Sequence, residues 1–335
     1  MNKYRLAIFG CGYAAREIHA SRIKALSDLF EVVALCDCNP MALDQMGKLF
    51  PKARCFENLN FMLSKIEADA LVILTPLHSE AIEVGLEKKL HIFVEKPFCE
   101  SLEDARRLAI KAKEQARILM VGAMRVFDPA LLYLKSQIES IGPILWVEIR
   151  DFCGQGMSSA SRSSLVDGNF QFGLPSLDHR LKNSLQTLLL EFVHDASILR
   201  ELFGAPISCR DAFISHDGWS VLGRLQLPGG IPCNFAVAEF GLVKRNIFEV
   251  NLTIASEKDF IKVLFGDPNI LGGATTIVLQ SGTKKSAFSS DPFMAEWLEF
   301  HHAIHEGRVT RNGAQDGLAD LELSWRIFDQ GHKNE

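Results

Sequence analysis

Several features that would place this chain in a specialised class are missing from its sequence. Among 335 residues, no apolar run approaches the roughly 20 needed to cross a bilayer. Basic residues are not in excess, because the net charge is −5 and the pI is about 6.1, which argues against nucleic acid or an anionic membrane as the main partner. The apolar run Leu6–Phe9 is too short for the core of a signal peptide. A cytoplasmic protein is therefore expected.

Closely spaced cysteine pairs are also scarce. The eight cysteines include no CxxC pair, and the closest two are Cys36 and Cys38. Neither a metal site nor a disulfide framework is expected, and the thiols are interpreted as buried and reduced.

What the sequence does contain is a globular composition, 47% hydrophobic and 23% charged, over a length that fits two domains. In residues 1–123 short apolar runs alternate with segments of helical periodicity. Nearly continuous apolar strands between amphipathic helices predict a doubly wound parallel sheet, the Rossmann architecture. The predicted strands are Leu6–Phe9, Val32–Cys36, Ala70–Thr75, His91–Val94 and Ile118–Val121, and the predicted helices are Ala14–Ser27, Met41–Phe50, Ser79–Glu87 and Leu102–Gln115.

The pattern changes in residues 124–335, which are assigned to a second, C-terminal α+β domain for substrate binding and oligomerisation. Its predicted strands suggest an open, mostly antiparallel sheet, with a hairpin at Pro-Gly-Gly-Ile-Pro. The polar stretch Gly154–Lys182 is interpreted as an active-site flap. The predicted strands are Ile144–Phe152, Trp219–Leu227, Cys233–Phe240, Arg245–Ser256, Asp259–Leu264 and Ala274–Ser281, and the predicted helices are Pro129–Ile138, Leu185–Leu202, Met294–His305 and Ala314–Phe328.

A dinucleotide fingerprint lies between the first strand and the first helix. Gly10 allows a tight turn, Gly12 lets the backbone approach a pyrophosphate, and Ala15 is small enough for close helix packing. Tyr13 and Ala14 complete the loop, whose free N–H groups and helix dipole suit an anion. Asp37 ends the second strand, where a carboxylate hydrogen-bonds the adenosine ribose and repels a 2′-phosphate; Cys38 supplies no compensating cation. NAD is therefore expected, and NADP is the less favoured alternative.

Further motifs occur at the ends of the later strands: Thr75-Pro76-Leu77-His78, Glu95-Lys96-Pro97, and the segment from Val121 to Pro129 with Arg125. Their order resembles the glucose–fructose oxidoreductase, inositol dehydrogenase and rhizopine-catabolism family (Gfo/Idh/MocA). The resemblance covers the whole chain and implies NAD(P)-dependent hydride transfer at a secondary alcohol or ketone of a sugar, sugar derivative or cyclitol. It further implies that the following residues line the cofactor: Thr75, Pro76, Leu77, His78, Glu95, Lys96 and Arg125.

The resemblance also implies two catalytic groups. Lys96 would hydrogen-bond the reacting oxygen, and His194 would act as general base. Many relatives carry an Asp four residues before that His, but this chain has Leu190 there. Either Glu191 supplies the carboxylate or the substrate does not need it; one residue along a helix turns a side chain by roughly 100°. Glu80 is a second departure, since relatives often have His at that position.

The substrate is left open among free sugar, sugar acid, nucleotide sugar and cyclitol. Arg180 and His179 are the candidate substrate contacts beside Lys96 and His194, and Arg180 would suit a carboxylate or phosphate. A non-catalytic dinucleotide-binding sensor or regulatory protein of the same fold is the alternative function, motivated by Leu190. The second face of the C-terminal sheet is mixed rather than strongly charged, so a homodimer or homotetramer joined through this sheet is expected.

Overall fold

The computed structural model describes residues 3–154, 177–240, 247–267, 273–280, 284–289 and 291–333. The chain divides into two compact units, the first made of Met1–Met124 with Phe293–Leu318 and the second of Arg125–Pro292 with Ala319–Glu335. In the described residues, no helix combines the length and the apolar character that a membrane span requires.

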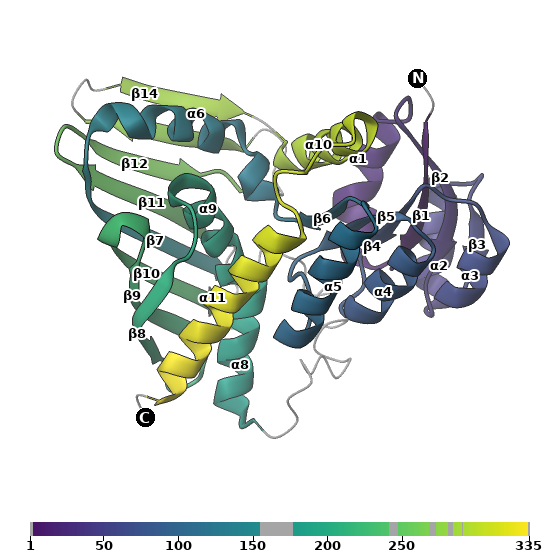
Figure 1. The fold of residues 1–335 in the computed structure, drawn as a ribbon, viewed down its shortest axis with the longest axis horizontal. Helices are drawn as coiled ribbons and strands as arrows, with labels where there is room; N and C mark the ends of the chain where they lie inside the picture. Colours follow the sequence, from purple (N-terminus) through teal and green to yellow (C-terminus); the bar gives the residue numbers. More distant parts are fainter. Residues whose placement is uncertain are drawn as a thin grey trace. The chain divides into compact units, whose positions relative to one another are not determined.

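The first unit contains a six-stranded sheet in the order β3-β2-β1-β4-β5-β6, with every neighbouring pair parallel (Figure 1). The central strands are apolar on both faces, and all four residues of β4 are buried. This is the doubly wound Rossmann arrangement that the alternating pattern predicted. The strands are β1 (Tyr4–Phe9), β2 (Phe30–Cys36), β3 (Arg54–Phe56), β4 (Ala70–Ile73), β5 (His91–Glu95) and β6 (Leu119–Gly122).

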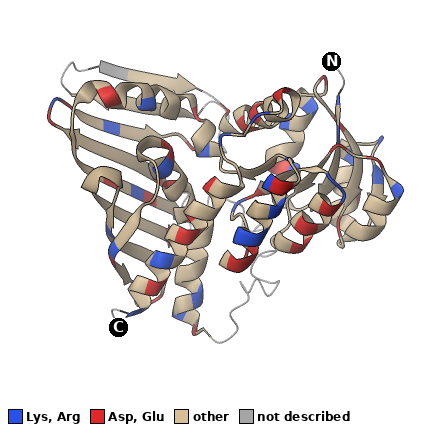
Figure 2. Cartoon of the chain, viewed as in Figure 1, with Lys and Arg blue, Asp and Glu red and all other residues tan. Residues whose placement is uncertain are grey.

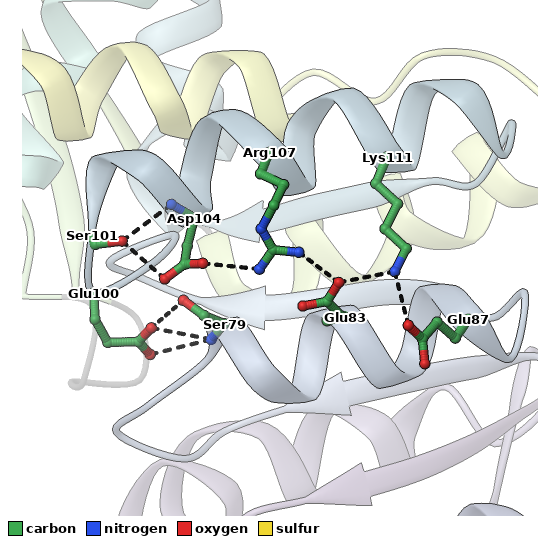
Figure 3. A network of polar contacts seen from close by, with 8 residues as sticks. All are labelled: Ser79, Glu83, Glu87, Glu100, Ser101, Asp104, Arg107 and Lys111. Atoms are coloured by element: carbon green, nitrogen blue, oxygen red, sulfur yellow. Dashed lines mark hydrogen bonds and ion pairs between the residues drawn. The ribbon is translucent and has the colours of Figure 1, made fainter.

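The helices of this unit begin at side-chain caps where the sequence provides them. Asn39 caps α2 and Ser101 caps α5, each side chain accepting backbone N–H groups of the first turn. On the exposed side of α4 and α5, Glu83 accepts from Arg107 and Lys111, as Figure 3 shows; exposed pairs of this kind stabilise the fold only weakly. The helices are η1 (Ala14–His19), α1 (Ala20–Ala25), α2 (Pro40–Leu49), α3 (Leu59–Lys65), α4 (Ser79–Glu87) and α5 (Leu102–Glu114).

Residues 293–318 belong to the first unit, whereas the sequence analysis assigned everything after 123 to the second domain. Helix α10 (Pro292–Glu306) provides the reason. Its Trp297 stacks on Phe93 of β5 with ring centroids 4.5 Å apart, and its Phe300 also packs on that ring. The apolar face of this helix is visible in the sequence, but periodicity does not say which sheet the face covers.

The second unit contains an eight-stranded sheet in the order β14-β13-β12-β11-β7-β10-β9-β8 (Figure 1). Only the central pair β7–β10 is parallel, so the expected mostly antiparallel sheet is confirmed. The strands are β7 (Ile144–Gly154), β8 (Ser208–Ile214), β9 (Ser220–Gln226), β10 (Pro232–Phe240), β11 (Phe248–Ser256), β12 (Phe260–Phe265), β13 (Ala274–Leu279) and β14 (Lys284–Ser289).

Burial alternates along the strands of this sheet. Val221 and Leu225 of β9 are buried, while Leu222 between them is 47% exposed. Helices α6, α8 and α9 pack on the buried face, and Figure 2 shows charged residues of both signs on the helices of both units. The helices are η2 (Met124–Phe127), α6 (Pro129–Ile138), η3 (Glu139–Ile141), α8 (His179–Thr187), η4 (Leu188–Phe192), α9 (Val193–Phe203), η5 (Pro228–Gly230) and α11 (Ala314–Lys333).

The helix predicted to begin at Leu185 begins earlier, at His179, because the Asp178 side chain accepts the backbone N–H of Leu181 at 2.8 Å. The C-terminal end of the predicted flap is therefore helix α8, and the rest of that flap, residues 155–176, lies outside the described residues. The elements β3, α3, β8 and β14 were not predicted. Edge strand β8 combines polar and apolar residues without a clear alternation and gives a weak sequence signal.

Stability is expected to fall in mild acid because of His91. Its Nδ1 accepts the N–H of Ile118 at 3.1 Å, and burial, with the Arg117 charge, lowers the pKa of the imidazole to about 4. The unfolded chain takes up this proton near pH 6.5 and the folded chain only near the lowered value, so folded stability is lost as pH falls through that interval. Between about pH 7.5 and 5 the free energy of unfolding should lose roughly 2 kcal/mol more in the parent than in His91→Gln, whose amide can still accept the N–H. Urea unfolding at both pH values measures this; parallel pH dependence in the two proteins would contradict it.

Candidate active site

The glycine-rich loop has the geometry that its sequence predicted. Gly10 has a φ of +99°, and a Cβ there would lie 2.6 Å from the backbone carbon of Leu74, so only glycine fits. A Cβ at Gly12 would meet nothing within 4 Å, which leaves open space above the loop. Ala15 is fully buried, as close helix packing requires. These features fit a dinucleotide pyrophosphate at the loop, with Gly12, Tyr13 and Ala14 providing the backbone that faces it.

A basic residue that the sequence analysis did not single out lies beside this loop. The helix after the loop opens with a π-helical segment, η1, and its Arg16 donates through Nη1 to the carbonyl oxygen of Cys11 at 2.5 Å. Such a guanidinium can also bind phosphate oxygens. A cationic side chain in the first helical turn after a glycine loop is the sequence signal that could have identified Arg16.

Asp37 lies at the end of β2 and is tied to the same loop. Its Oδ2 accepts the backbone N–H of Cys11 at 2.6 Å, and its Oδ1 accepts that of Asn39 at 2.8 Å. Each oxygen retains a second lone pair for a ribose hydroxyl. Cys38, its neighbour, is exposed and carries no charge that would offset the carboxylate.

The segment after β4 is fastened to the segment after β5 through His78. This side chain is 2% exposed, with Nδ1 2.7 Å from the carbonyl oxygen of Pro97 and Nε2 2.6 Å from that of Thr75. Carbonyl oxygens only accept, so the ring holds these two backbone segments through its nitrogen atoms. Glu100 accepts the N–H groups of His78 and Ser79 at the start of α4, as Figure 3 shows for Ser79. His78 thus holds two strand ends together, while Leu77 is 58% exposed.

Glu95 and Lys96 follow at the end of β5. Glu95 Oε2 accepts the backbone N–H of Lys96 at 3.1 Å, and Oε1 lies 2.9 Å from Nε2 of the buried His19. Burial, the largest influence, raises the pKa of Glu95, but the hydrogen bond and electrostatic effect of His19, followed by the charge and backbone N–H of Lys96, hold it below its ordinary value. Glu95 is therefore a carboxylate beside Lys96. His19 was missed because a lone histidine in a helix carries no signal of its own.

These groups share one edge of the parallel sheet. Strand β1 is the neighbour of β4, and β4 the neighbour of β5; the register pairs Phe9 with Ile73 and Ile73 with Val94. The residues that follow, Gly10, Thr75 and Lys96, therefore lie at the carboxyl ends of adjacent strands. Chain order reverses between β1 and β4, which is where open α/β sheets bind their ligands.

In the second unit, His194 lies on α9 and is 6% exposed. It follows η4, a π-helical segment that contains Leu190 and Glu191. A π turn takes one more residue than an α turn and is frequent at functional sites. Glu191 is half-buried, and its carboxyl lies within 4.8 Å of ligand atoms of Asp151 and Cys153 on β7.

Buried acidic groups surround this part of α9. Asp195 is fully buried, and burial raises its pKa well above the usual range; Asp151 and Glu191 raise it further, and the Arg125 charge opposes them. The Cys153 thiol donates to Asp151 Oδ1 at 2.8 Å, and burial raises the pKa of that thiol. The set Asp151, Cys153 and Glu191 could hold a cation, which the sequence analysis did not foresee.

Two predicted contacts have other partners in the second unit. The Arg180 guanidinium donates to the carbonyl oxygens of Ile214 and Ser215, both at 2.7 Å, so it fastens α8 to the end of β8. The substrate role predicted for Arg180 stays a prediction, and His179 lies exposed at the start of α8. Arg125, assigned to the cofactor, is 4% exposed, with its guanidinium 5.2 Å from the ring centres of Phe248 and Phe265.

Residues 4–123 match the model of an oxidoreductase family with an NAD-binding Rossmann fold. Inositol 2-dehydrogenase of Acidothermus cellulolyticus is 30% identical over 334 residues, covering 94% of this chain and 89% of that protein. UDP-N-acetylglucosamine 3-dehydrogenase of Acidithiobacillus ferrooxidans is 29% identical over 39% of this chain and 40% of its own length.

Solved structures share the fold over nearly the whole chain. A putative NADPH-dependent oxidoreductase of Desulfitobacterium hafniense has a TM-score of 0.81 at 18% identity, covering 100% of this chain and 97% of that one. An Agrobacterium radiobacter oxidoreductase solved with NAD⁺ has a TM-score of 0.79 at 17% identity, with 100% and 98% covered. With a relative this similar over most of both chains and with the loop, Glu95 and Lys96 in place, this chain belongs to the Gfo/Idh/MocA family of NAD(P)-binding oxidoreductases.

Proposed function

We propose that this protein transfers a hydride between NAD and a secondary alcohol or ketone of a sugar-like or cyclitol substrate. The observation that carries the proposal is the shared strand edge of the first unit, where Gly10, Thr75 and Lys96 follow adjacent parallel strands. A nicotinamide cofactor bound there supplies the hydride acceptor or donor. The relatives named inositol 2-dehydrogenase and UDP-N-acetylglucosamine 3-dehydrogenase support the substrate class.

Two side chains of this chain are proposed as the polar catalysts. During oxidation the hydride leaves the carbinol carbon, and the hydroxyl proton must leave the oxygen. His194 takes that proton, and the Lys96 ammonium hydrogen-bonds the oxygen as it gains negative charge. In reduction the same groups work in reverse. Glu191 is the candidate second carboxylate, since it stands beside Asp151 in the same unit as His194.

A substrate panel tests this function directly. The purified protein is incubated with NAD or NADH and with sugars, uronates, nucleotide sugars, cyclitols and their ketones, while absorbance of the reduced nicotinamide is followed. Turnover with at least one secondary alcohol or ketone is expected. Tight cofactor binding with no absorbance change across the panel would instead favour a non-catalytic dinucleotide sensor.

Cofactor choice gives a separate prediction. NAD is expected to bind at least about tenfold more tightly than NADP. A tenfold difference in affinity corresponds to about 1.4 kcal/mol, and repulsion between the Asp37 carboxylate and a 2′-phosphate can supply this free energy. Asp37→Asn should reduce the preference to about threefold or less, because the amide keeps an acceptor for the loop N–H without the charge. Fluorescence titration with both cofactors measures this. Tighter NADP binding by the parent protein would contradict the assignment of Asp37.

Assembly gives another prediction. The face of the eight-stranded sheet that carries Leu222 and Leu264 leaves these side chains 47% and 48% exposed. We expect a homodimer, or a tetramer of such dimers, that buries this face between copies. Replacing both leucines with aspartate should shift the mass measured by light scattering toward one chain of 37.3 kDa. The control is a double variant, Ile110→Asp with Met41→Asp, at two exposed helical positions; its mass should be unchanged. A parent protein that is monomeric at micromolar concentration would contradict the proposed assembly.

A further inference from the structure

A buried chain of hydrogen bonds runs from Trp297 to Lys96 within the first unit. The Trp297 indole Nε1–H donates to His19 Nδ1 at 3.1 Å, and His19 Nε2 lies 2.9 Å from Glu95 Oε1. The other Glu95 oxygen accepts the Lys96 backbone N–H. His19 and Trp297 are both fully buried, and their rings pack edge to face 5.7 Å apart. The elements involved, η1, β5 and α10, are far apart in the sequence.

This geometry fixes the tautomer of His19. An indole nitrogen is a donor only, so Nδ1 must accept and carries no proton. The single ring proton is therefore on Nε2, where it is donated to Glu95. The hydrogen bond at Nδ1 therefore determines that Nε2 carries the ring proton.

The fixed tautomer in turn holds the Glu95 carboxylate. Glu95 pairs with Gly122 in the register of β5 with β6, and a Cβ at Gly122 would lie 3.2 Å from Oε1. A second carboxyl, that of the buried Glu296, has an oxygen within 4.8 Å of both His19 and Glu95. The His19 Nε2–H reaches Glu95 Oε1, and the other oxygen of Glu95 accepts the backbone N–H of Lys96.

We infer that His19 is a positioning residue: it keeps Glu95 as an oriented carboxylate that holds the backbone of Lys96, and Trp297 sets the tautomer that does so. The inference rests on the proposed role of Lys96. His19 contacts neither substrate nor reacting atoms in this assignment, and it acts through Glu95.

One measurement tests the tautomer without any enzymatic activity. In protein labelled with ¹⁵N-histidine, the His19 ring resonances, assigned by their absence in His19→Gln, should report a proton on Nε2 and none on Nδ1. A ring that carries its proton on Nδ1 would overturn the inference.

Kinetics test the positioning role, using a substrate found with the panel. His19→Leu removes the donor to Glu95 and should lower kcat by about 10- to 100-fold, as small misplacements of catalytic groups do. The cofactor dissociation constant should stay within about threefold, because the glycine loop is unchanged. The pKa of Glu95 should rise without its donor, so the acid limb of the kcat profile should move to higher pH. His19→Gln, whose amide N–H can replace Nε2–H, should restore both kcat and the limb.

A second variant reaches the same carboxylate from the opposite side. Gly122→Ala places a methyl group 3.2 Å from Glu95 Oε1 and 3.3 Å from Phe93 Cζ, and it should lower kcat even where His19→Leu fails to fold. Gly47→Ala, whose added methyl would make only ordinary contact with Cys55, is the matched control.

The outcomes separate the two claims. Unchanged kcat in His19→Leu or in Gly122→Ala, together with an inactive Lys96→Ala, overturns the positioning role and leaves the proposed function standing. Full activity in Lys96→Ala means that the proposed function has failed, and the positioning role fails with it. Loss of kcat that His19→Gln does not recover indicates a purely structural histidine and also overturns the inference.

Discussion

Replacing Lys96 with alanine is expected to lower kcat/KM by about 10²–10⁴-fold, the usual cost of losing a catalytic acid or base. Lys96 follows β5 directly, and its backbone N–H is held by the Glu95 carboxylate. The ammonium would stabilise negative charge on the reacting oxygen, which develops only as the hydride moves. The loss should therefore appear mainly in kcat, with cofactor affinity little changed.

Steady-state kinetics and a cofactor titration together check the Lys96 prediction. Lys96→Arg keeps a positive charge with a different shape and should be intermediate. Lys113→Ala, an exposed position on α5, is the matched control and should behave like the parent. A Lys96→Ala enzyme within a few-fold of the parent would show that this lysine is an ordinary surface residue.

The second large effect is expected at His194. His194→Ala should also lower kcat/KM by about 10²–10⁴-fold, because the imidazole is the proposed acceptor of the hydroxyl proton. The buried side chain also contributes packing, so the variant should lose some thermal stability as well. His194→Gln keeps a polar side chain of similar reach but cannot accept a proton as a base. It should remain nearly as inactive as alanine while folding more stably.

Comparing the two substitutions separates catalysis from folding. Activity is measured under conditions where circular dichroism and thermal melting show that each variant is folded. His216→Ala, an exposed position between β8 and β9, should change neither quantity. If His194→Gln turns over substrate at nearly the parent rate, the histidine is structural, and another group must take the proton.

Where the chemistry of a segment is local, the sequence predicted it well. The glycine loop is an example, because the positive φ of Gly10 and its 2.6 Å approach to Leu74 admit no side chain. The strand that precedes it and the helix that follows it are also local patterns. For the same reason Asp37 could be placed at the end of β2 from chain distance alone.

Side-chain partners across elements could not be predicted in this way. The Arg180 side chain was predicted to contact a substrate anion, and the structure shows that its Nε and Nη2 donate to carbonyl oxygens at the end of β8. Asp151 and Asp195 give no motif, yet they lie in the same buried acidic environment as Glu191. Each of these relations depends on how a helix packs on a sheet.

The sequence by itself determined the two fold classes, the cofactor loop and the strand ends that carry Thr75 and Lys96, because periodicity, glycine requirements and strand-end chemistry are short-range. Only the tertiary structure decided that residues 293–318 join the first unit and that Trp297 meets His19. It also decided the π-helical turn before His194. The physical reason is the same in each case: which apolar face covers which sheet, and which donor meets which acceptor, is chosen by competition among long-range contacts. Such contacts cannot be predicted from the spacing of residues along the chain.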